Sequence, residues 1–456
     1  MPNAIEYVRQ NKDRFRSELE ALLRIPSVST APERKGEMEQ AANWVAAELK
    51  KLGFDGVKLM PTGGHPLVYA EYMKAGAGAP TVLLYAHYDV QPAEPLDLWT
   101  TGAFEPTVRG ENLYARGASD MKGELMALLK AIEALLRSGQ GLAVNLKCMF
   151  EGEEEIGSPH LAPTIAANKA LFKADFCLNV DGGILAPDCP SITYGLRGIA
   201  YFEINVTGPV GDLHSGIFGG AVHNPATVLC ELIAGMHDAE GRVTLPGFYD
   251  KVRALSAEER GWLAKLPAND AWWMEKSGAP ALFGEAGYSS TERASARPTL
   301  DVNGFLTGYT GKGSKTVLPS KAMAKVSMRL VPDQDPDEIR TSLERYLKEK
   351  APPTITWTVD THSSSRASIM ARDSVAVRAA SAAFEAVWGK APLFKREGGS
   401  VPVVGQIQDL LGMESLLVGF GLPDDNLHAP NEKLHLPTWY RGIEVFVHFF
   451  EQLRKK

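Results

Sequence analysis

The sequence predicts an α/β protein with a second, α+β domain inserted into its chain. Apolar, strand-like runs alternate with helical segments over residues 1–196, and the same pattern returns over 366–456. Between them, residues 197–365 follow the order strand, helix, strand, strand, helix, strand. A chain of 456 residues is long enough for two domains. We therefore expect one discontinuous domain, 1–196 with 366–456, and one inserted domain, 197–365.

The spacing of apolar residues assigns the elements of the discontinuous domain. Leucines at positions 125, 128, 129, 135 and 136 form one face of a helix that begins after Asp120. Alternating strands and helices favour a sheet with helices on both faces. The other helices are expected at 4–24, 37–52, 161–171, 375–387 and 437–453, and the strands at 67–72, 81–86, 144–150, 176–180 and 415–418.

The inserted domain has the element order of a ferredoxin-like α+β fold. Asn224 and Asp335 are each followed by proline, and a capping residue before proline is typical of a helix start. The segment 240–298 is rich in aromatic residues, so we expect it to pack rather than to form a disordered linker. The strands are expected at 199–207, 299–305, 322–331 and 354–359, and the helices at 224–236 and 336–348.

Composition excludes several classes of protein. The formal charge is −7 and basic residues cluster only at 454–456, so we expect no nucleic-acid partner. No segment approaches the ~18 apolar residues of a membrane span, and the N-terminus lacks the apolar core of a signal peptide. We therefore expect a cytoplasmic protein without a membrane partner.

The four cysteines do not form a binding motif. Cys148, Cys177, Cys189 and Cys230 show no CxxC spacing and have apolar neighbours. This pattern favours reduced core residues over disulfide bridges or a thiolate metal site.

Polar residues that suit a metal site stand directly after the predicted strands. His87 and Asp89 follow one strand, the acidic turn 151–155 follows the next, and Asp181 follows a third. Strand ends of an α/β sheet gather at one edge, where ligands bind. Crowded carboxylates repel one another unless solvent or cations relieve them. A solvated acidic loop would explain the turn alone, whereas the coincidence with His87, Asp120 and Asp181 favours a dication site.

The kinds of ligand at these positions indicate the metal and its use. Imidazole and carboxylate ligands without thiolate suit zinc, manganese or cobalt at a hydrolytic centre. A pair of metals ~3.5–4 Å apart needs a bridging carboxylate, ligands on each side and a base for the attacking water. The chain has residues of each kind.

Five segments together resemble the M20 family of metallopeptidases, and within it the carnosinase-type cytosolic dipeptidases. They are 87–90 (HYDV), 117–123 (GASDMKG), 154–158 (EEIGS), 212–216 (DLHSG) and 424–433 (DDNLHAPNEK). The resemblance spans nearly the whole chain. It implies a mixed-sheet catalytic domain of the zinc-exopeptidase type, formed by 1–196 and 366–456, and a lid and dimerisation domain formed by 197–365.

The resemblance implies two divalent metal ions and their ligands. His87 and Asp181 would hold one metal, and Glu155 and His428 would hold the other. Asp120 would bridge the two. Zn²⁺ is the expected metal, with Mn²⁺ or Co²⁺ as alternatives.

The resemblance also implies the catalytic residues. Glu154 would be the general base, taking a proton from a metal-bridging water and passing it to the leaving amine. Asp89 would accept the ring proton of His87 and fix its tautomer. His214 would stabilise the developing oxyanion from the lid, and in dimeric members of the family it comes from the partner subunit.

Substrate binding would use residues around a terminal carboxylate. Arg329 lies in a predicted lid strand and would bind this carboxylate through two hydrogen bonds. Gly399 and Ser400 resemble a turn that holds the same group, and Thr316 lies in a lid segment near the substrate. The expected substrate is a small dipeptide, and the expected assembly is a homodimer through the lid.

Two other functions stay open. A related deacylase, of the succinyl-diaminopimelate desuccinylase or acetylornithine deacetylase type, would share the metal ligands. Dipeptidases of the family tend to carry aspartate at position 181, where deacylases tend to carry glutamate, so Asp181 favours the dipeptidase. A non-catalytic binding protein of the same fold would have lost ligands or the base, yet all of them are present.

Overall fold

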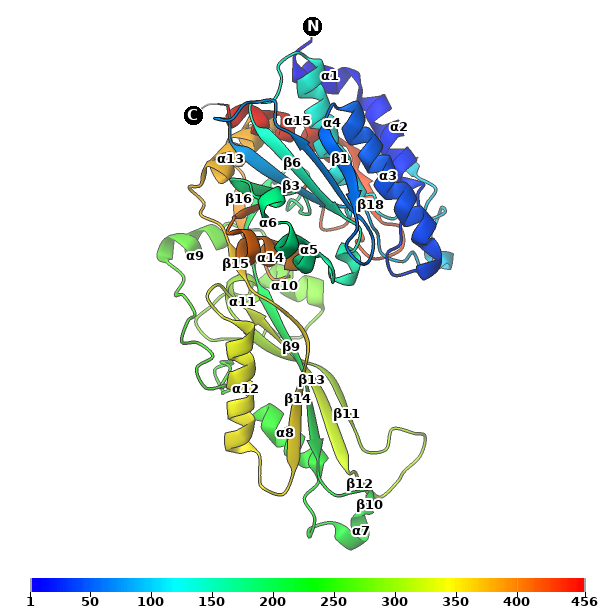
Figure 1. Ribbon diagram of the computed structural model, residues 1–456. Helices are drawn as coiled ribbons and strands as arrows, with labels where there is room; N and C mark the ends of the chain where they lie inside the picture. Colours follow the sequence, from blue (N-terminus) through cyan, green and yellow to red (C-terminus); the bar gives the residue numbers. More distant parts are fainter. Residues whose placement is uncertain (1, 400, 455–456) are drawn as a thin grey trace. The chain divides into compact units, whose positions relative to one another are not determined.

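The computed structural model describes residues 2–399 and 401–454, which divide into two compact units (Figure 1). The first unit comprises the chain up to Tyr194, Met370–Lys395 and the chain from Gln406. The second comprises Gly195–Ile369 and Arg396–Gly405. The domain limits expected from the sequence, at 196/197 and 365/366, stay a prediction. Among the described residues, no helix combines the length and apolar character needed to cross a membrane.

A mixed sheet forms the centre of the first unit. Its strand order is β1-β2-β6-β3-β7-β17-β8, in which β6, β3, β7 and β17 run parallel and β1, β2 and β8 run antiparallel to their neighbours. This confirms the predicted mixed α/β fold. The strands are β1 (Asp55–Met60), β2 (Leu67–Tyr72), β3 (Thr81–His87), β6 (Asn145–Glu151), β7 (Phe176–Asn179), β8 (Ser191–Leu196), β16 (Leu393–Glu397) and β17 (Ser415–Leu417).

Helices cover both faces of this sheet. On β3, Val82 and Leu84 join the large apolar core beneath the helices, while Leu83 and Tyr85 point to the opposite face and are also fully buried. On that opposite face, the ring of Phe172 lies 5.9 Å from that of Tyr69. The helices are α1 (Ala4–Gln10), α2 (Lys12–Leu23), α3 (Lys35–Lys51), α4 (Lys122–Arg137), α5 (Leu161–Ala167), α6 (Lys169–Phe172), α13 (Val375–Trp388), α14 (Pro402–Leu411) and α15 (Leu436–Gln452).

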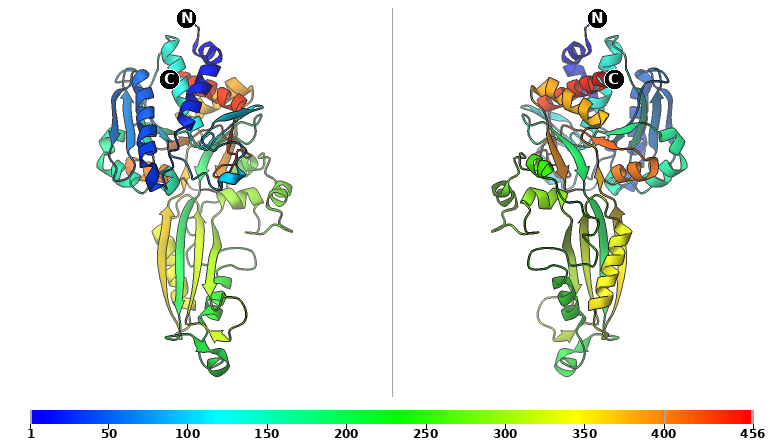
Figure 2. Two further views of the ribbon diagram at one scale, coloured as in Figure 1. Left: turned by 90° about the vertical axis from the view of Figure 1, so that its right-hand side faces the viewer. Right: turned by 90° about the vertical axis from the view of Figure 1, so that its left-hand side faces the viewer.

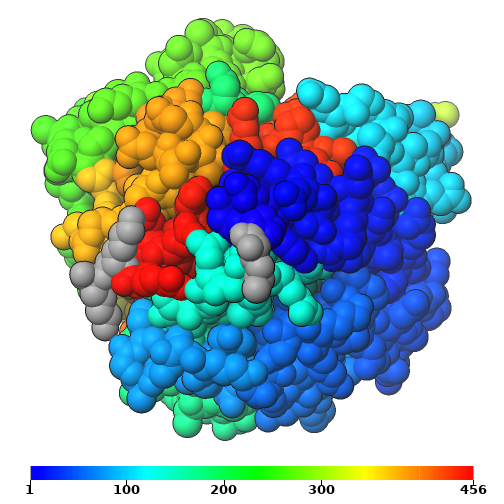
Figure 3. All heavy atoms as spheres, turned by 90° about the horizontal axis from the view of Figure 1, so that it is seen from above, coloured from blue at the N-terminus to red at the C-terminus, as the bar shows by residue number. Residues whose placement is uncertain are grey.

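The two ends of the chain lie side by side in the first unit. Figure 3 shows the blue N-terminal helices next to red residues of the C-terminal helix. Arg9 Nε of α1 lies 2.8 Å from Glu444 Oε1 of α15, and apolar residues of both helices belong to one core. Helix α15 thus packs against α1, so segments from both ends of the sequence contribute to the core of the first unit.

Two single helices expected from the sequence are each broken. Residues 4–24 form α1 and α2 with a break at Asn11, and residues 161–171 form α5 and α6 with a break at Asn168. At both breaks the asparagine amide donates to a carbonyl four residues earlier, that of Tyr7 or Thr164. Asparagine side chains compete with the backbone for such bonds, so the helix is interrupted there.

The second unit contains a four-stranded antiparallel sheet of order β11-β13-β9-β14. This is the order of a ferredoxin-like sheet, as predicted. Figure 2 shows the long strands side by side with α12 along one face. The elements are β9 (Gly198–Thr207), α8 (Pro225–Ala234), β11 (Thr299–Thr307), β13 (Lys321–Leu330), α12 (Pro336–Lys350) and β14 (Thr356–Ser365), and β15 (Ser368–Ile369) pairs with the end of β8.

Burial alternates along the strands of this sheet. Every second residue of β9 and β13 is buried against α8 and α12, and the residues between face the other side of the sheet. Asn224 and Asp335 accept hydrogen bonds from the first turns of α8 and α12, which confirms both predicted caps. Arg329 therefore belongs to the face that the helices leave uncovered.

The aromatic segment 240–298 is folded within the second unit. It contains α9 (Ala257–Leu263), α10 (Asp270–Ser277) and α11 (Ser290–Ala296). Trp273 Nε1 donates to Thr291 Oγ1 at 3.1 Å, and Leu263 and Leu266 are buried. The segment packs, as expected.

The cysteines fit the prediction except for one. Cys148 and Cys177 are buried, Cys189 is half-buried, and all four are free thiols. Cys230 is exposed on α8, so its assignment to the core was wrong. An apolar neighbourhood in sequence does not fix which side of a helix faces the core.

Candidate metal centre

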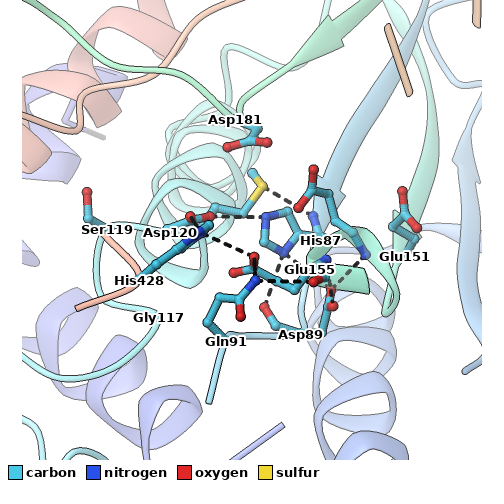
Figure 4. Close-up of polar contacts among 12 residues, drawn as sticks. His87, Asp89, Gln91, Gly117, Ser119, Asp120, Glu151, Glu155, Asp181 and His428 are labelled. Carbon is cyan, nitrogen blue, oxygen red and sulfur yellow. Dashed lines mark hydrogen bonds and ion pairs between the residues drawn. The ribbon is translucent and has the colours of Figure 1, made fainter. Parts of the chain in front are cut away.

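Three parallel strands end at the candidate metal centre (Figure 4). His87 is the last residue of β3 and is paired with Glu151, the last residue of β6. Asp181 follows β7, the other neighbour of β3. Because parallel strands bring their carboxyl ends to one edge, these side chains share the same rim of the sheet.

Asp120 lies between two histidines. Its Oδ1 is 3.2 Å from His87 Nε2, and its Oδ2 is 3.0 Å from His428 Nε2. His428 Nε2 is also 3.2 Å from Glu155 Oε2. One carboxylate thus presents a separate oxygen to each imidazole, as a bridging ligand must.

The potential ligand atoms form two groups that share Asp120. Those of His87, Asp120 and Asp181 lie within 4.8 Å of one another, and so do those of Asp120, Glu155 and His428. Two imidazoles and three carboxylates are a donor set that suits zinc, manganese or cobalt. His87 Nε2 is buried, and its 3.2 Å contact with Asp120 Oδ1 lacks the geometry of a hydrogen bond, so a metal ion between the two atoms would satisfy it.

Asp89 is fully buried and connects His87 with the acidic turn. Its carboxylate lies 3.3 Å from His87 Nδ1 and accepts hydrogen bonds from the backbone N–H groups of Glu154 and Glu155. The shortest contact of His87 Nδ1 is instead to the Asp89 backbone carbonyl, at 3.1 Å. Either contact favours a proton on Nδ1 and leaves Nε2 for a metal.

Burial and like charge shift the pKa values of the carboxyl groups. Burial, together with the neighbouring carboxylates Glu155, Asp120 and Asp89, raises the pKa of Glu154 to about 7. Burial and the Asp120 charge raise the pKa of Asp181 well above its ordinary value. Asp120 is also buried, yet hydrogen bonds from His428 and His87 hold its pKa below the ordinary value. This excess of carboxylates in a dry site is the arrangement that a dication stabilises.

Gln91 is a site residue that the sequence analysis missed. Its Nε2 donates to Glu155 Oε2 at 2.8 Å and to the Glu155 carbonyl at 3.1 Å. It thereby fixes the rotamer of a candidate ligand. In the sequence, Gln91 stands two residues after Asp89. A glutamine at that position is neither a typical metal ligand nor an acid or base, so the sequence did not indicate its role.

Tyr85 and Ser158 donate to the buried carboxylate of Glu151, at 2.6 and 2.9 Å. Burial raises the pKa of Glu151 to about 7. The first carboxylate of the acidic turn therefore anchors the turn rather than joining either group of ligand atoms.

His214 and Thr316 are neighbours in the second unit. β10 (Leu213–His214) pairs with β12 (Val317–Leu318), and the Ser215 N–H donates to the Thr316 carbonyl. His214 is exposed just before α7 (Ser215–Phe218), and its Nδ1 accepts from the Gly216 N–H at 3.0 Å. An imidazole that accepts at Nδ1 carries its proton at Nε2, where it can donate.

The remaining candidates for substrate binding also belong to the second unit. Arg329 is half-buried and cross-strand from Ile199 and Thr299, and burial lowers its pKa. Gly399 follows β16, and the carbonyl of the preceding Gly398 accepts from Arg197 Nε at 3.0 Å. Ser400 lies outside the described residues.

Comparison with known proteins assigns the family. Residues 83–452 match the profile of peptidase family M20/M25/M40, and the chain belongs to this family. It is 34% identical over 468 residues to the Cys-Gly metallodipeptidase dug1 of Schizosaccharomyces pombe, covering 98% of this chain and 97% of that one. It is 28% identical to the human Beta-Ala-His dipeptidase, covering 99% of this chain and 92% of that one. The family predicted from the sequence motifs is thereby confirmed.

A solved structure supports the same assignment. An M20 family metallo-carboxypeptidase from Sulfolobus solfataricus is 35% identical, with a TM-score of 0.84 over 96% of this chain and 99% of that one. The similarity covers both units of the chain.

Proposed function

We propose that the protein is a dinuclear metal-dependent dipeptidase that hydrolyses unblocked dipeptides. The observation that carries this proposal is the sharing of Asp120 between two groups of ligand atoms at the strand ends. The names of the relatives, Cys-Gly metallodipeptidase and Beta-Ala-His dipeptidase, support a dipeptide as the substrate.

His87 and Asp181 would hold one metal, Glu155 and His428 the other, and Asp120 both. When bound, two divalent cations, Zn²⁺ first and Mn²⁺ or Co²⁺ as alternatives, supply Lewis-acid chemistry that activates water and polarises the peptide carbonyl. Glu154 takes the proton from the attacking water and returns it to the leaving amine. Its backbone N–H donates to Asp89, and it is next in sequence to the proposed ligand Glu155, which supports this role.

The second unit would supply substrate contacts. His214 would donate from Nε2 to the oxyanion, and Arg329 would bind the terminal carboxylate together with the turn at Gly399 and Ser400. Thr316 precedes Val317, the strand partner of His214, and its carbonyl accepts from the Ser215 N–H, which supports assigning it to the same group of contacts.

We also infer a cytoplasmic homodimer that associates through the second unit, with no membrane or nucleic-acid partner. β11 is an edge strand of its sheet and exposes Val302, Phe305 and Leu306. Exposed apolar residues on an unpaired edge are typical of a surface that another chain covers.

Two other activities compete with the dipeptidase. A deacylase of the family would use the same metal ligands, although Asp181 favours the dipeptidase. Carboxypeptidase activity is the second candidate, because a structure similar over nearly its full length is a metallo-carboxypeptidase.

A substrate panel separates these activities. Metal-depleted protein is given zinc, manganese or cobalt and tested on dipeptides, matched N-acyl amino acids and matched N-blocked longer peptides. We expect metal-dependent turnover of the free dipeptides and little of the others. Turnover of only the acylated compounds, or of only the longer peptides, would refute the dipeptidase proposal.

A further inference from the structure

We propose that Glu432, a residue outside the two groups of ligand atoms, is a positioning residue that holds the bridging carboxylate Asp120 in place. Glu432 is 0% exposed. It lies four residues after His428, and its side chain crosses to the loop that carries Asp120. The proposal rests on the proposed metal centre, but it does not depend on which substrate is hydrolysed.

The Glu432 carboxylate accepts four hydrogen bonds from the Asp120 loop. Oε1 accepts from the backbone N–H groups of Ser119 and Asp120, both at 3.0 Å. Oε2 accepts from the Gly117 N–H at 2.9 Å and from Arg116 Nη1 at 2.8 Å. Both oxygens are therefore fully used in ordering the backbone from Arg116 to Asp120.

The guanidinium of Arg116 compensates the negative charge of the Glu432 carboxylate. It is 1% exposed, pairs with Glu432, and donates through Nη2 to the Pro92 carbonyl at 3.0 Å. A buried carboxylate without a cation would repel the ligand carboxylates. With its charge compensated by Arg116, Glu432 can order the loop without adding to the excess negative charge of the site.

A second carboxylate ties the same two loops together. Asp425 is fully buried and accepts from Ser119 Oγ at 2.8 Å and from the Leu422 N–H at 2.7 Å. Lys433 Nζ lies 2.9 Å from its other oxygen. Ser119, which Figure 4 shows beside Asp120, is therefore held through its backbone by Glu432 and through its side chain by Asp425.

The loop that supplies these groups also carries the ligand candidate His428. Asn426, His428 and Asn431 all have positive φ, at 55°, 58° and 61°. Non-glycine residues in this region cost free energy and persist where surrounding contacts impose them. The bonds of Glu432 and Asp425, together with the pairing of β18 (Lys433–His435) with β5 (Asn112–Tyr114), supply such contacts.

It follows that the Asp120–His428 half of the centre is assembled by the protein itself. One clamp, consisting of Glu432, Arg116, Asp425 and Ser119, sets both the bridging carboxylate and the imidazole that faces it. Loss of the clamp would weaken metal binding without removing any ligand.

Zinc affinity of the full-length protein tests this proposal. In Glu432→Gln, an amide donor replaces one oxygen and opposes a backbone N–H donor, while the side-chain volume is kept. We expect zinc affinity, measured by chelator competition without substrate, to fall about 10–100-fold. The absorption spectrum of the cobalt-loaded protein is expected to change as well. At saturating zinc, kcat would fall while KM changes little, because the variant alters no substrate contact.

Glu285→Gln is the matched control. Glu285 is 5% exposed and pairs with Arg297 and Arg242 in the second unit. This variant removes a buried ion pair of the same kind, so we expect lower thermal stability with unchanged zinc affinity. Zinc affinity that falls equally in both variants would show a general loss of stability and overturn the positioning role.

Unchanged zinc affinity in folded Glu432→Gln would overturn the proposal directly. If that variant does not fold, Ser119→Ala replaces it, since it removes only the hydroxyl that contacts Asp425. A several-fold weaker zinc affinity supports the clamp, and an unchanged one overturns it. Tight zinc binding by a wild-type protein that cleaves no dipeptide would refute the proposed function while leaving the clamp intact.

Discussion

Asp120 is the residue on which the candidate centre depends most. Each of its carboxylate oxygens faces one histidine, and its backbone is held by a buried carboxylate from a distant loop. A ligand so constrained has little freedom to lose when metals bind, which favours tight binding. The geometry of the candidate centre therefore depends on side chains outside the two groups of ligand atoms.

Replacing Glu154 separates metal binding from catalysis. In Glu154→Gln the proposed base is lost while all five proposed ligands stay. We expect two metals per chain by elemental analysis and a fall in kcat of about 10²–10⁴-fold. Activity close to that of the wild type would contradict the assignment of Glu154 as the base.

Replacing Gln91 tests whether the orientation of Glu155 affects metal binding. In Gln91→Ala the amide that donates to Glu155 Oε2 is absent. We expect about 10-fold weaker binding of one of the two metals, measured by titration calorimetry on metal-free protein. Gln91→Glu, which adds a carboxylate beside Glu155, is expected to show a different metal affinity from Gln91→Ala. Identical, wild-type affinities in both variants would exclude this role.

The sequence points to the proposed ligands more readily than to the residues that hold them in place. His87, Asp120, Glu155, Asp181 and His428 belong to short motifs or follow strand runs, so their chemistry is local. Gln91 and Glu432 act through contacts with other segments, and nothing in their own neighbourhood reveals those contacts. Glu432 lies in the segment 424–433 that resembles the family, but the sequence does not show that it is buried or that it contacts the Asp120 loop.

Strands and helices were predicted where apolar periodicity is strong. β2, β3, β9 and β13 agree with their expected ranges to within two residues. β2 and β3 are mostly continuous buried runs, whereas burial alternates along β9 and β13. Short strands such as β4 (Thr107–Arg109) and β5 were missed, since three residues carry too little pattern. The breaks at Asn11 and Asn168 were missed because apolar spacing continues across each of them.

The contacts of Glu133 predict how the stability of the packed helices α1, α2 and α4 depends on pH. Glu133, in α4, accepts from Tyr7 of α1, and it pairs with Arg14 of α2 and with Lys130. Although burial alone would raise the pKa of Glu133, Arg14 and Lys130 hold it below the ordinary value of 4.5. The stability that it contributes is therefore complete above pH 4.5 and is lost as pH falls through the lower folded pKa.

Glu133→Gln is expected to lower the free energy of unfolding by about 2 kcal/mol at pH 7. The difference from wild type is expected to shrink as pH falls from 4.5 through the lower folded-state pKa of Glu133, because the wild-type carboxyl becomes protonated there. Denaturant unfolding of metal-free protein measures both values. Glu344→Gln, in the exposed pair with Arg340, is the control and is expected to change little. A pH-independent difference for Glu133→Gln would refute the electrostatic explanation.

In the whole molecule, the proposed catalytic and substrate-binding residues are divided between two units. The proposed ligands and base belong to the first, whereas His214, Thr316, Arg329 and Gly399 belong to the second. If residues of both units act at one active site, the two units can come from the same chain or from different chains of a dimer. Mixed variants distinguish these two arrangements.

Mixing two inactive variants tests whether His214 acts across subunits. His214→Ala alone is expected to lower kcat about 10²–10³-fold with little loss of metal. When His214→Ala and Glu154→Gln are mixed and allowed to exchange subunits, a mixed dimer would contain one site with both groups intact only if His214 acts in trans. Recovered activity indicates action in trans, and absence of recovery in proven mixed dimers indicates action in cis. Unchanged kcat in His214→Ala would exclude the oxyanion role.

Charges on the β11 edge test the proposed dimer. In Phe305→Lys with Leu306→Glu, two exposed apolar side chains become charged. We expect a monomer in sedimentation velocity, because removing two apolar side chains and burying two charges on each edge opposes association. Leu96→Lys is the control, since Leu96 is 61% exposed in the first unit. A double variant that sediments like the wild type would place the interface elsewhere.

The late position of the clamp along the chain has a consequence for biosynthesis. His87 and Asp120 leave the ribosome long before Glu432, and at ~5–20 residues per second the interval is tens of seconds. During that interval the nascent chain contains acidic ligand residues but neither His428 nor the carboxylates that order the Asp120 loop. A translation product that stops before residue 425 would contain the family motifs of its N-terminal half and still lack an assembled centre. On the proposed centre, hydrolytic activity would therefore be withheld until residues 425–432 have been synthesised.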